Sequence, residues 1–146
     1  MYGGLEYLQF LYFGLLLTLK YQNNKIIMKK EFVTYEQALA LKELGVGFPY
    51  IAWYLPNNPM LILHPAPMTT MDIPAPLKQQ VFRWFREKYD WYLDLGHGER
   101  VDFYYAILKN SEPFEWRNDY STYEEAENAC IDKLIEIAKQ QDHDRR

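Results

Sequence analysis

The sequence predicts a small α+β domain in which two β-hairpins form one small antiparallel sheet against three helices, in the order α-β-β-α-β-β-α. Three observations predict this class. Apolar residues recur with a period of 3.6 in some segments and of two in others, turn residues separate two pairs of apolar runs, and capping boxes mark two helix starts. The chain has 146 residues, 49% hydrophobic and 25% charged, which is typical of a folded, soluble domain.

Residues 1–27 differ in composition from the rest of the chain. They hold seven Leu and an apolar run at residues 7–19, which is shorter than the roughly 20 residues that span a bilayer. No positively charged segment precedes the run, as it does in a signal peptide. We expect Met28 to be the true start. Residues 1–27 would then be leader sequence that was assigned to the protein by mistake, or else a disordered or loosely helical N-terminal extension. The alternative is a membrane anchor at residues 7–19.

The domain then covers residues 28–141, and residues 142–146 form a frayed tail. Its first element is a helix over residues 35–44. Thr34 and Gln37 have the spacing of a capping box, and Gly45 suits the position just after a helix end.

A hairpin is predicted next. The apolar runs at residues 50–55 and 60–64 are separated by Pro56-Asn-Asn-Pro59, which is turn chemistry between strands. The segment 65–76 contains four prolines, which interrupt regular hydrogen bonding. We therefore expect it to be an irregular crossing loop.

From Leu77 to Tyr89 the period is 3.6 again, which predicts the second helix. Its apolar stripe is about 160° wide, whereas one core-facing helix needs roughly 100°. We therefore expect this helix to be buried on two sides, by the sheet on one side and by either another helix or a partner on the other. The stripe contains Leu77, Val81, Phe82, Trp84, Phe85 and Tyr89.

Alternation with period two then predicts a second hairpin, turned by Gly96-His-Gly98. One face is apolar and the other is wet. The stretch around residues 112–116 is expected to be irregular. The capping box at Thr122 and Glu125 then starts a final helix that ends near residue 140. The wet face is predicted to carry Asp90, Tyr92, Asp94, Asp102, Tyr104 and Ala106.

Three segments of this sequence resemble a family of small uncharacterised proteins encoded by phages and prophages of Bacteroidetes. The segments are Glu31-Phe-Val-Thr-Tyr-Glu-Gln-Ala to Gly45, Pro76 to Tyr89 with Phe-Arg-Trp-Phe-Arg-Glu-Lys-Tyr, and Thr122-Tyr-Glu-Glu-Ala to Ile137. The resemblance covers nearly all of residues 28–146. In that family the first motif lies a few residues from the initiator methionine, which favours Met28 as the start. The resemblance implies no activity, and therefore no catalytic residues.

The sequence contains no recognisable catalytic, metal or cofactor motif. The three His lie in separate segments, and the only Cys, Cys130, falls on the apolar stripe of the last helix. Neither Gly45-Val-Gly47 nor Gly96-His-Gly98 has the further residues of a phosphate loop. We therefore expect a non-enzyme without a cofactor. A single Cys also suits the cytoplasm of the bacterial host.

Binding is the function that the residues favour. Tyr92 and Tyr104 share the predicted wet face with Asp94 and Asp102, a composition suited to protein recognition. On the second helix, Arg83 and Arg86 lie one turn apart and are candidates to bind an anion. The resulting hypothesis is a non-catalytic accessory factor that binds a protein partner, or a second copy of itself.

Two alternatives stay open. A nucleic-acid-binding module would need a local patch at Arg83, Arg86 and Lys88, because the chain has 16 basic and 20 acidic residues, a net charge of −4. A small carboxylate-dependent enzyme would need Asp90, Asp94 and Asp102 to cluster. Membrane binding is expected only if residues 7–19 are an anchor.

Overall fold

The computed structural model describes residues 28–99 and 102–144, together with residues 12, 15, 16, 19, 20, 22 and 23. The chain divides into two units, residues 1–31 and residues 32–146. In the first unit, the described residues up to 30 are helical. Most of residues 1–27, including most of the candidate anchor at residues 7–19, lies outside the described residues. Within the described part of the chain, no helix is both long enough and apolar enough to cross a membrane.

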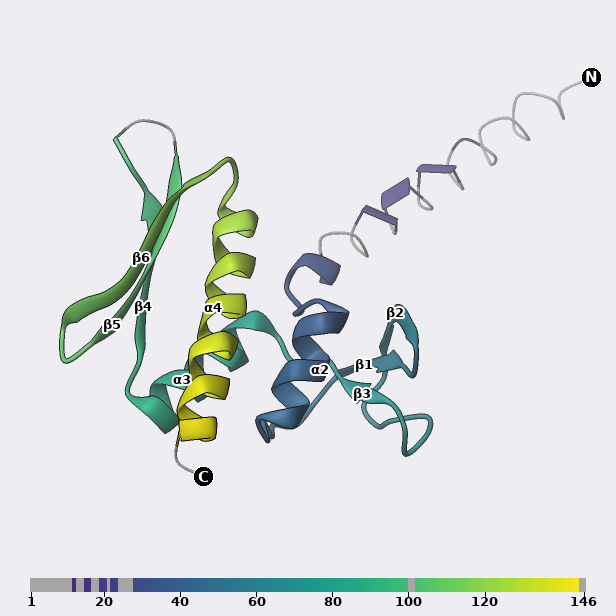
Figure 1. Cartoon of the computed structure of the whole chain (residues 1–146). Coiled ribbons are helices and arrows are strands. Elements are labelled where there is room, and N and C mark those ends of the chain that lie inside the picture. Colours follow the sequence, from purple (N-terminus) through teal and green to yellow (C-terminus); the bar gives the residue numbers. More distant parts are fainter. Residues whose placement is uncertain are drawn as a thin grey trace, which may run out of the picture. The chain divides into compact units, whose positions relative to one another are not determined.

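The second unit confirms the α+β class (Figure 1). Its described residues form three helices and two three-stranded antiparallel sheets, with strand orders β2-β1-β3 and β4-β5-β6. The elements are α2 (Tyr35–Glu43), β1 (Ala52–Leu55), β2 (Asn58–Leu63), β3 (Ile73–Pro74), α3 (Lys78–Tyr89), β4 (Tyr92–His97), β5 (Phe103–Lys109), β6 (Glu112–Tyr120) and α4 (Tyr123–Asp144).

Both predicted hairpins form, but the prediction that they share one sheet is wrong. β1 pairs with β2 on one edge and with β3 on the other, where Tyr54 faces Ile73. β5 likewise lies between β4 and β6. Each hairpin thus gains its third strand, β3 or β6, from a nearby part of the chain, and among the described residues no strand of one sheet pairs with a strand of the other.

β6 occupies the stretch that was predicted to be irregular. Two register shifts interrupt its pairing with β5, one between Phe103 and Tyr105 and one between Ile107 and Leu108. Bulges of this kind break the period of two, so the sequence of β6 does not alternate cleanly. Pro113 is tolerated because β6 is an edge strand, whose outer N–H groups need no partner in the sheet.

The predicted start and end of the first helix are confirmed. The Gln37 N–H donates to the Thr34 hydroxyl at 3.2 Å, and the Thr34 N–H donates to Gln37 Oε1 at 3.0 Å. Gly45 has φ +77°, and the Val46 N–H closes the helix end on the Leu41 carbonyl at 3.1 Å. This is a Schellman-type ending, which favours glycine because a Cβ is disfavoured at positive φ.

α4 covers one face of the second sheet, as Figure 1 shows. It extends through Asp144, beyond the predicted end near residue 140, because no Gly or Pro interrupts it. Residues 142–144 of the predicted tail are therefore helical, whereas residues 145 and 146 lie outside the described part. The buried side of α4 includes Ala126, Cys130, Ile131, Leu134, Ile135 and Ala138.

α3 contacts both α4 and β4, so its wide apolar stripe is buried by a helix and a sheet of the same chain. The fully buried Trp91 ring stacks on Tyr89 and Phe85, with ring centroids 4.5 Å and 5.9 Å apart. A buried ion pair also links the two helices, with Lys78 Nζ 3.0 Å from Glu127 Oε2.

The loop between β2 and β3 is held by a carboxylate. Asp72 accepts hydrogen bonds from the Thr69 hydroxyl at 2.7 Å and from the N–H groups of Met68 and Thr69 at 2.7 and 3.0 Å. These bonds, above all those from Thr69, lower the pKa of Asp72 below its ordinary value of 3.8.

Replacing Asp72 by Asn is expected to remove a pH-dependent part of the stability. Because the pKa is lowered in the folded protein, the ionised carboxylate stabilises the fold above the ordinary pKa. That contribution is lost as the pH falls through the folded pKa. Urea unfolding from about pH 6 to about pH 2.5 should show the difference between wild type and Asp72→Asn shrinking with acid. A constant difference would contradict the prediction.

Candidate functional site

The candidate site is the face of the second sheet opposite α4. In Figure 1 none of the described helices and strands of the second unit lies on that side. The register places Asp94 opposite Ala106, and Ala106 opposite Trp116, so the three side chains form a row across the sheet. We call this the outer face. It consists of Tyr92, Asp94 and Gly96 from β4, Tyr104, Ala106 and Leu108 from β5, and Trp116 from β6.

Tyr104 is held in place on the outer face. It lies opposite Gly96, and a Cβ on Gly96 would approach the Tyr104 hydroxyl to 2.6 Å, so the ring passes directly over the glycine. Its hydroxyl donates to Asp94 Oδ2 at 3.2 Å. The nearby charge of Asp94 is the main reason that the pKa of Tyr104 is raised. The ring is therefore ordered before any partner arrives.

This geometry corrects the predicted hairpin turn. Gly96 and His97 belong to β4, and the chain reverses after them, where the Gly98 N–H donates to the Asp102 carbonyl at 2.8 Å. Glycine signals a turn in sequence because of its backbone freedom. Here it serves a different purpose, since its missing side chain leaves room for the ring of Tyr104.

Exposed aromatic surface lies on both sides of Ala106. Tyr92 is 50% exposed and Trp116 is 56% exposed, whereas Ala106 is only 6% exposed because larger side chains stand around it. The predicted placement of Tyr92, Asp94 and Tyr104 on one open face is confirmed. Trp116 was missed, because the bulged sequence of β6 was not recognised as a strand.

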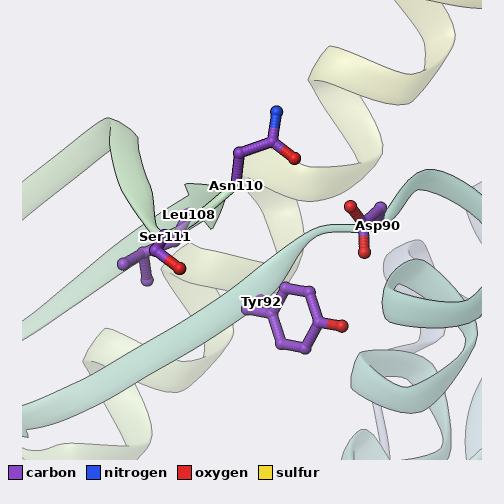
Figure 2. Close-up of a pocket in the computed structure, with 5 residues that line it drawn as sticks. All are labelled: Asp90, Tyr92, Leu108, Asn110 and Ser111. Atoms are coloured by element: carbon purple, nitrogen blue, oxygen red, sulfur yellow. The ribbon is translucent and has the colours of Figure 1, made fainter.

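An open recess lies at the end of the outer face where β4 begins. Its volume is about 470 Å³, and Figure 2 shows that its lining comes from two places, the segment that leads from α3 into β4 and the end of β5 with the turn that follows. Asp90, Asn110 and Ser111 have φ of 60°, 53° and 65°, so all three are in the left-handed region. The lining residues are Asp90, Tyr92, Leu108, Asn110 and Ser111.

The three aspartates do not cluster. Asp94 lies opposite Ala106 on the neighbouring strand. Ala106 is four residues after Asp102, so Asp94 and Asp102 are separated along the strand direction by roughly 13 Å, given the rise of an extended chain. Asp90 is four residues before Asp94 and lies in the recess. All three side chains are exposed. The juxtaposition that a carboxylate-dependent enzyme needs is absent for these residues.

The basic residues of α3 are partly engaged within the helix. Arg83 Nε donates to Glu87 Oε1 at 2.7 Å, which is the main reason that the pKa of Arg83 is raised. Lys88 Nζ lies 4.5 Å from the centre of the Trp84 ring. Arg86 is exposed on the last turn. These residues lie on a helix and not on the outer face, so the structure does not join them to Tyr92 and Tyr104.

No group of His, Cys and carboxylates among the described residues is arranged to hold a metal ion. Cys130 is buried in α4. Burial, with a smaller contribution from the charge of Glu127, raises the pKa of the Cys130 thiol, so it stays protonated near neutral pH.

The Cys130 thiol is therefore expected to be unreactive in the folded protein. Dithiobis-nitrobenzoate should label it only as fast as the protein unfolds, whereas the same reagent in concentrated denaturant should label it at once. Absorbance of the released thiolate measures both rates. Rapid labelling under native conditions would contradict this prediction, because it would show that the thiol is accessible and able to act as a nucleophile.

The fold and this site define a small α+β protein with an open aromatic and acidic sheet face. Comparison of the chain with protein-family models, curated proteins and solved structures finds no match. Any functional assignment therefore depends on the site itself.

Proposed function

We propose that this protein is a non-catalytic accessory factor that binds a positively charged segment of another protein through the outer face. The observation that carries the proposal is the ordered pair of Tyr104 and Asp94 beside the exposed rings of Tyr92 and Trp116. Aromatic side chains contribute disproportionately to protein–protein binding, since they bury a large area at a small entropic cost.

The charge of this region indicates what kind of partner fits. Residues 90–120 contain seven acidic and three basic side chains, a difference of −4 that equals the net charge of the whole chain. Asp94 is the only ionisable carboxylate or cation in the outer face as defined above. Complementary charge guides association and rejects partners of like charge. A segment rich in Arg or Lys is therefore favoured.

The other hypotheses have less support. Nucleic acid would be repelled by the acidic sheet, and Arg83 on α3 is already paired with Glu87. The apolar stripe of α3 that favoured self-association is buried within the chain, so we name another protein as the partner. A cytoplasmic location in the bacterial host, and the resemblance to phage-encoded proteins, remain part of the proposal.

The test is a selection of random peptides displayed against the full chain. The recovered peptides are expected to be enriched in Arg and Lys. A peptide selected in this way should bind the Trp116→Ala variant about tenfold more weakly, because a large exposed aromatic anchor of the outer face has been removed. Its binding to the wild type should also weaken in salt. Fluorescence anisotropy of the labelled peptide measures both effects.

Met60→Ala is the matched control. Met60 is a large apolar residue on β2, 54% exposed and therefore similar to Trp116 in its exposure, but it belongs to the other sheet. This variant should keep wild-type affinity. Recovered peptides without an excess of basic residues, or equal losses in the two variants, would refute the proposal.

A further inference from the structure

We infer that the recess at the start of β4 binds the side chain of an arginine of the partner. This inference rests on the proposed function and adds the identity of the group that is recognised. The recess adjoins the outer face through Tyr92 and Leu108, which belong to both. A partner lying on the outer face can therefore reach the recess with one long side chain.

The polar groups of the recess are available to a ligand. Asp90 donates its backbone N–H to the Arg86 carbonyl at 3.1 Å, but its carboxylate has no ion pair or hydrogen bond with any other described residue. The same is true of the side chains of Tyr92, Asn110 and Ser111. Because these groups are not used to hold the fold together, they are free to bind a guest.

The chemistry of the lining selects a cation. The only ionised group among the five lining residues is the Asp90 carboxylate, and the Asn110 carbonyl and the Ser111 hydroxyl add further acceptors. An anion would find no opposing charge. The half-exposed ring of Tyr92 offers a surface for a cation to stack on. A guanidinium fits this set best, since it is planar, carries five donors and is weakly hydrated.

The position of Asp90 adds a separate argument. It ends α3 in the left-handed conformation, where Gly or Asn is preferred. A carboxylate at the negative end of a helix dipole is also electrostatically unfavourable. Gly or Asn at this position would therefore stabilise the fold more than Asp90 does, whereas recognition of a cation requires the negative charge that Asp90 supplies.

The opposite wall of the recess is built on a tight backbone turn. Lys109 faces Glu112 across the ladder, so Asn110 and Ser111 form a two-residue connection, and both have positive φ. This is the geometry of a type I′ turn, which matches the twist of the flanking strands. The backbone at Asn110 is thus set before a ligand binds, and only the side chains of the recess have to be ordered on binding.

The test is a titration of the ¹⁵N-labelled full chain with Nα-acetylarginine amide, followed by amide chemical shifts. Shifts are expected at residues 90, 92, 108, 110 and 111, with an affinity in the millimolar range because a single side chain makes few contacts. Nα-acetylcitrulline amide has nearly the same shape without the charge, so it should produce much smaller shifts. Asp90→Asn keeps a residue that tolerates positive φ, and it should bind arginine amide about fivefold or more weakly.

Asp119→Asn is the control variant. Asp119 is also an exposed aspartate with positive φ, 81°, but it lies near the far end of β6, away from the recess. It should bind like the wild type. The inference is overturned if arginine amide causes no shifts at the recess, if citrulline amide is equivalent, or if both variants weaken binding equally. Failure here with peptide binding still sensitive to Trp116→Ala would remove only the arginine recess, whereas loss of that sensitivity removes the proposed function.

Discussion

Replacing Lys78 by Met is expected to lower the free energy of unfolding by about 3–5 kcal/mol. The side chains of Lys78 and Glu127 are only 5% and 10% exposed, and Nζ lies 3.0 Å from Oε2. The substitution keeps the bulk of the side chain but leaves the Glu127 carboxylate buried without its partner. A domain of this size is typically stable by about 5–15 kcal/mol, so the loss should be plain in urea unfolding followed by tryptophan fluorescence.

The control is the double variant Lys78→Met/Glu127→Leu. A buried ion pair replaced as a whole by apolar residues is often neutral or even stabilising, because neither charge has to be desolvated. The double variant should therefore recover most of the stability lost in Lys78→Met. Equal losses in the two variants would mean that packing, and not the unpaired charge, causes the effect.

Replacing Gly96 by Ala is expected to destabilise the protein by about 1 kcal/mol, because the added Cβ displaces the end of the Tyr104 side chain and breaks its hydrogen bond to Asp94. The added Cβ would lie 2.6 Å from the Tyr104 hydroxyl oxygen and 2.7 Å from the ring carbon that bears it. The ring must move, and its hydrogen bond to Asp94 is lost. Thermal unfolding and the near-ultraviolet signal of the tyrosine report the two consequences.

The decisive comparison is made in the Tyr104→Ala background. Once the ring is gone, Gly96→Ala meets no obstruction, and alanine is favoured over glycine within a strand by about 0.5–1 kcal/mol. The sign of the substitution should therefore reverse, from destabilising to stabilising. A substitution that destabilises both backgrounds equally would show that the backbone at residue 96, and not the Tyr104 ring, requires glycine.

Sequence patterns predict correctly those features of the fold that depend on interactions between residues close together in the chain. The capping box at Thr34 and Gln37, the glycine after α2 and the apolar period of α3 are all determined by residues within a few positions of each other, and all are confirmed. The alternation of β4 also placed Tyr92 and Asp94 on the open face. The prediction of an irregular stretch at residues 112–116 is wrong, because bulges remove the alternation by which a strand is recognised.

The sequence by itself determined the α+β class, the three helices, the two hairpins and the side of the second hairpin that faces water. Only the tertiary structure decided that the hairpins form two sheets, that Trp116 joins the outer face, and that Asp90 meets Asn110 and Ser111 across a recess. The physical reason is the range of the interactions. Helix caps and hydrophobic periods act over a few residues, whereas sheet order and a recess depend on contacts between residues that are distant in the chain.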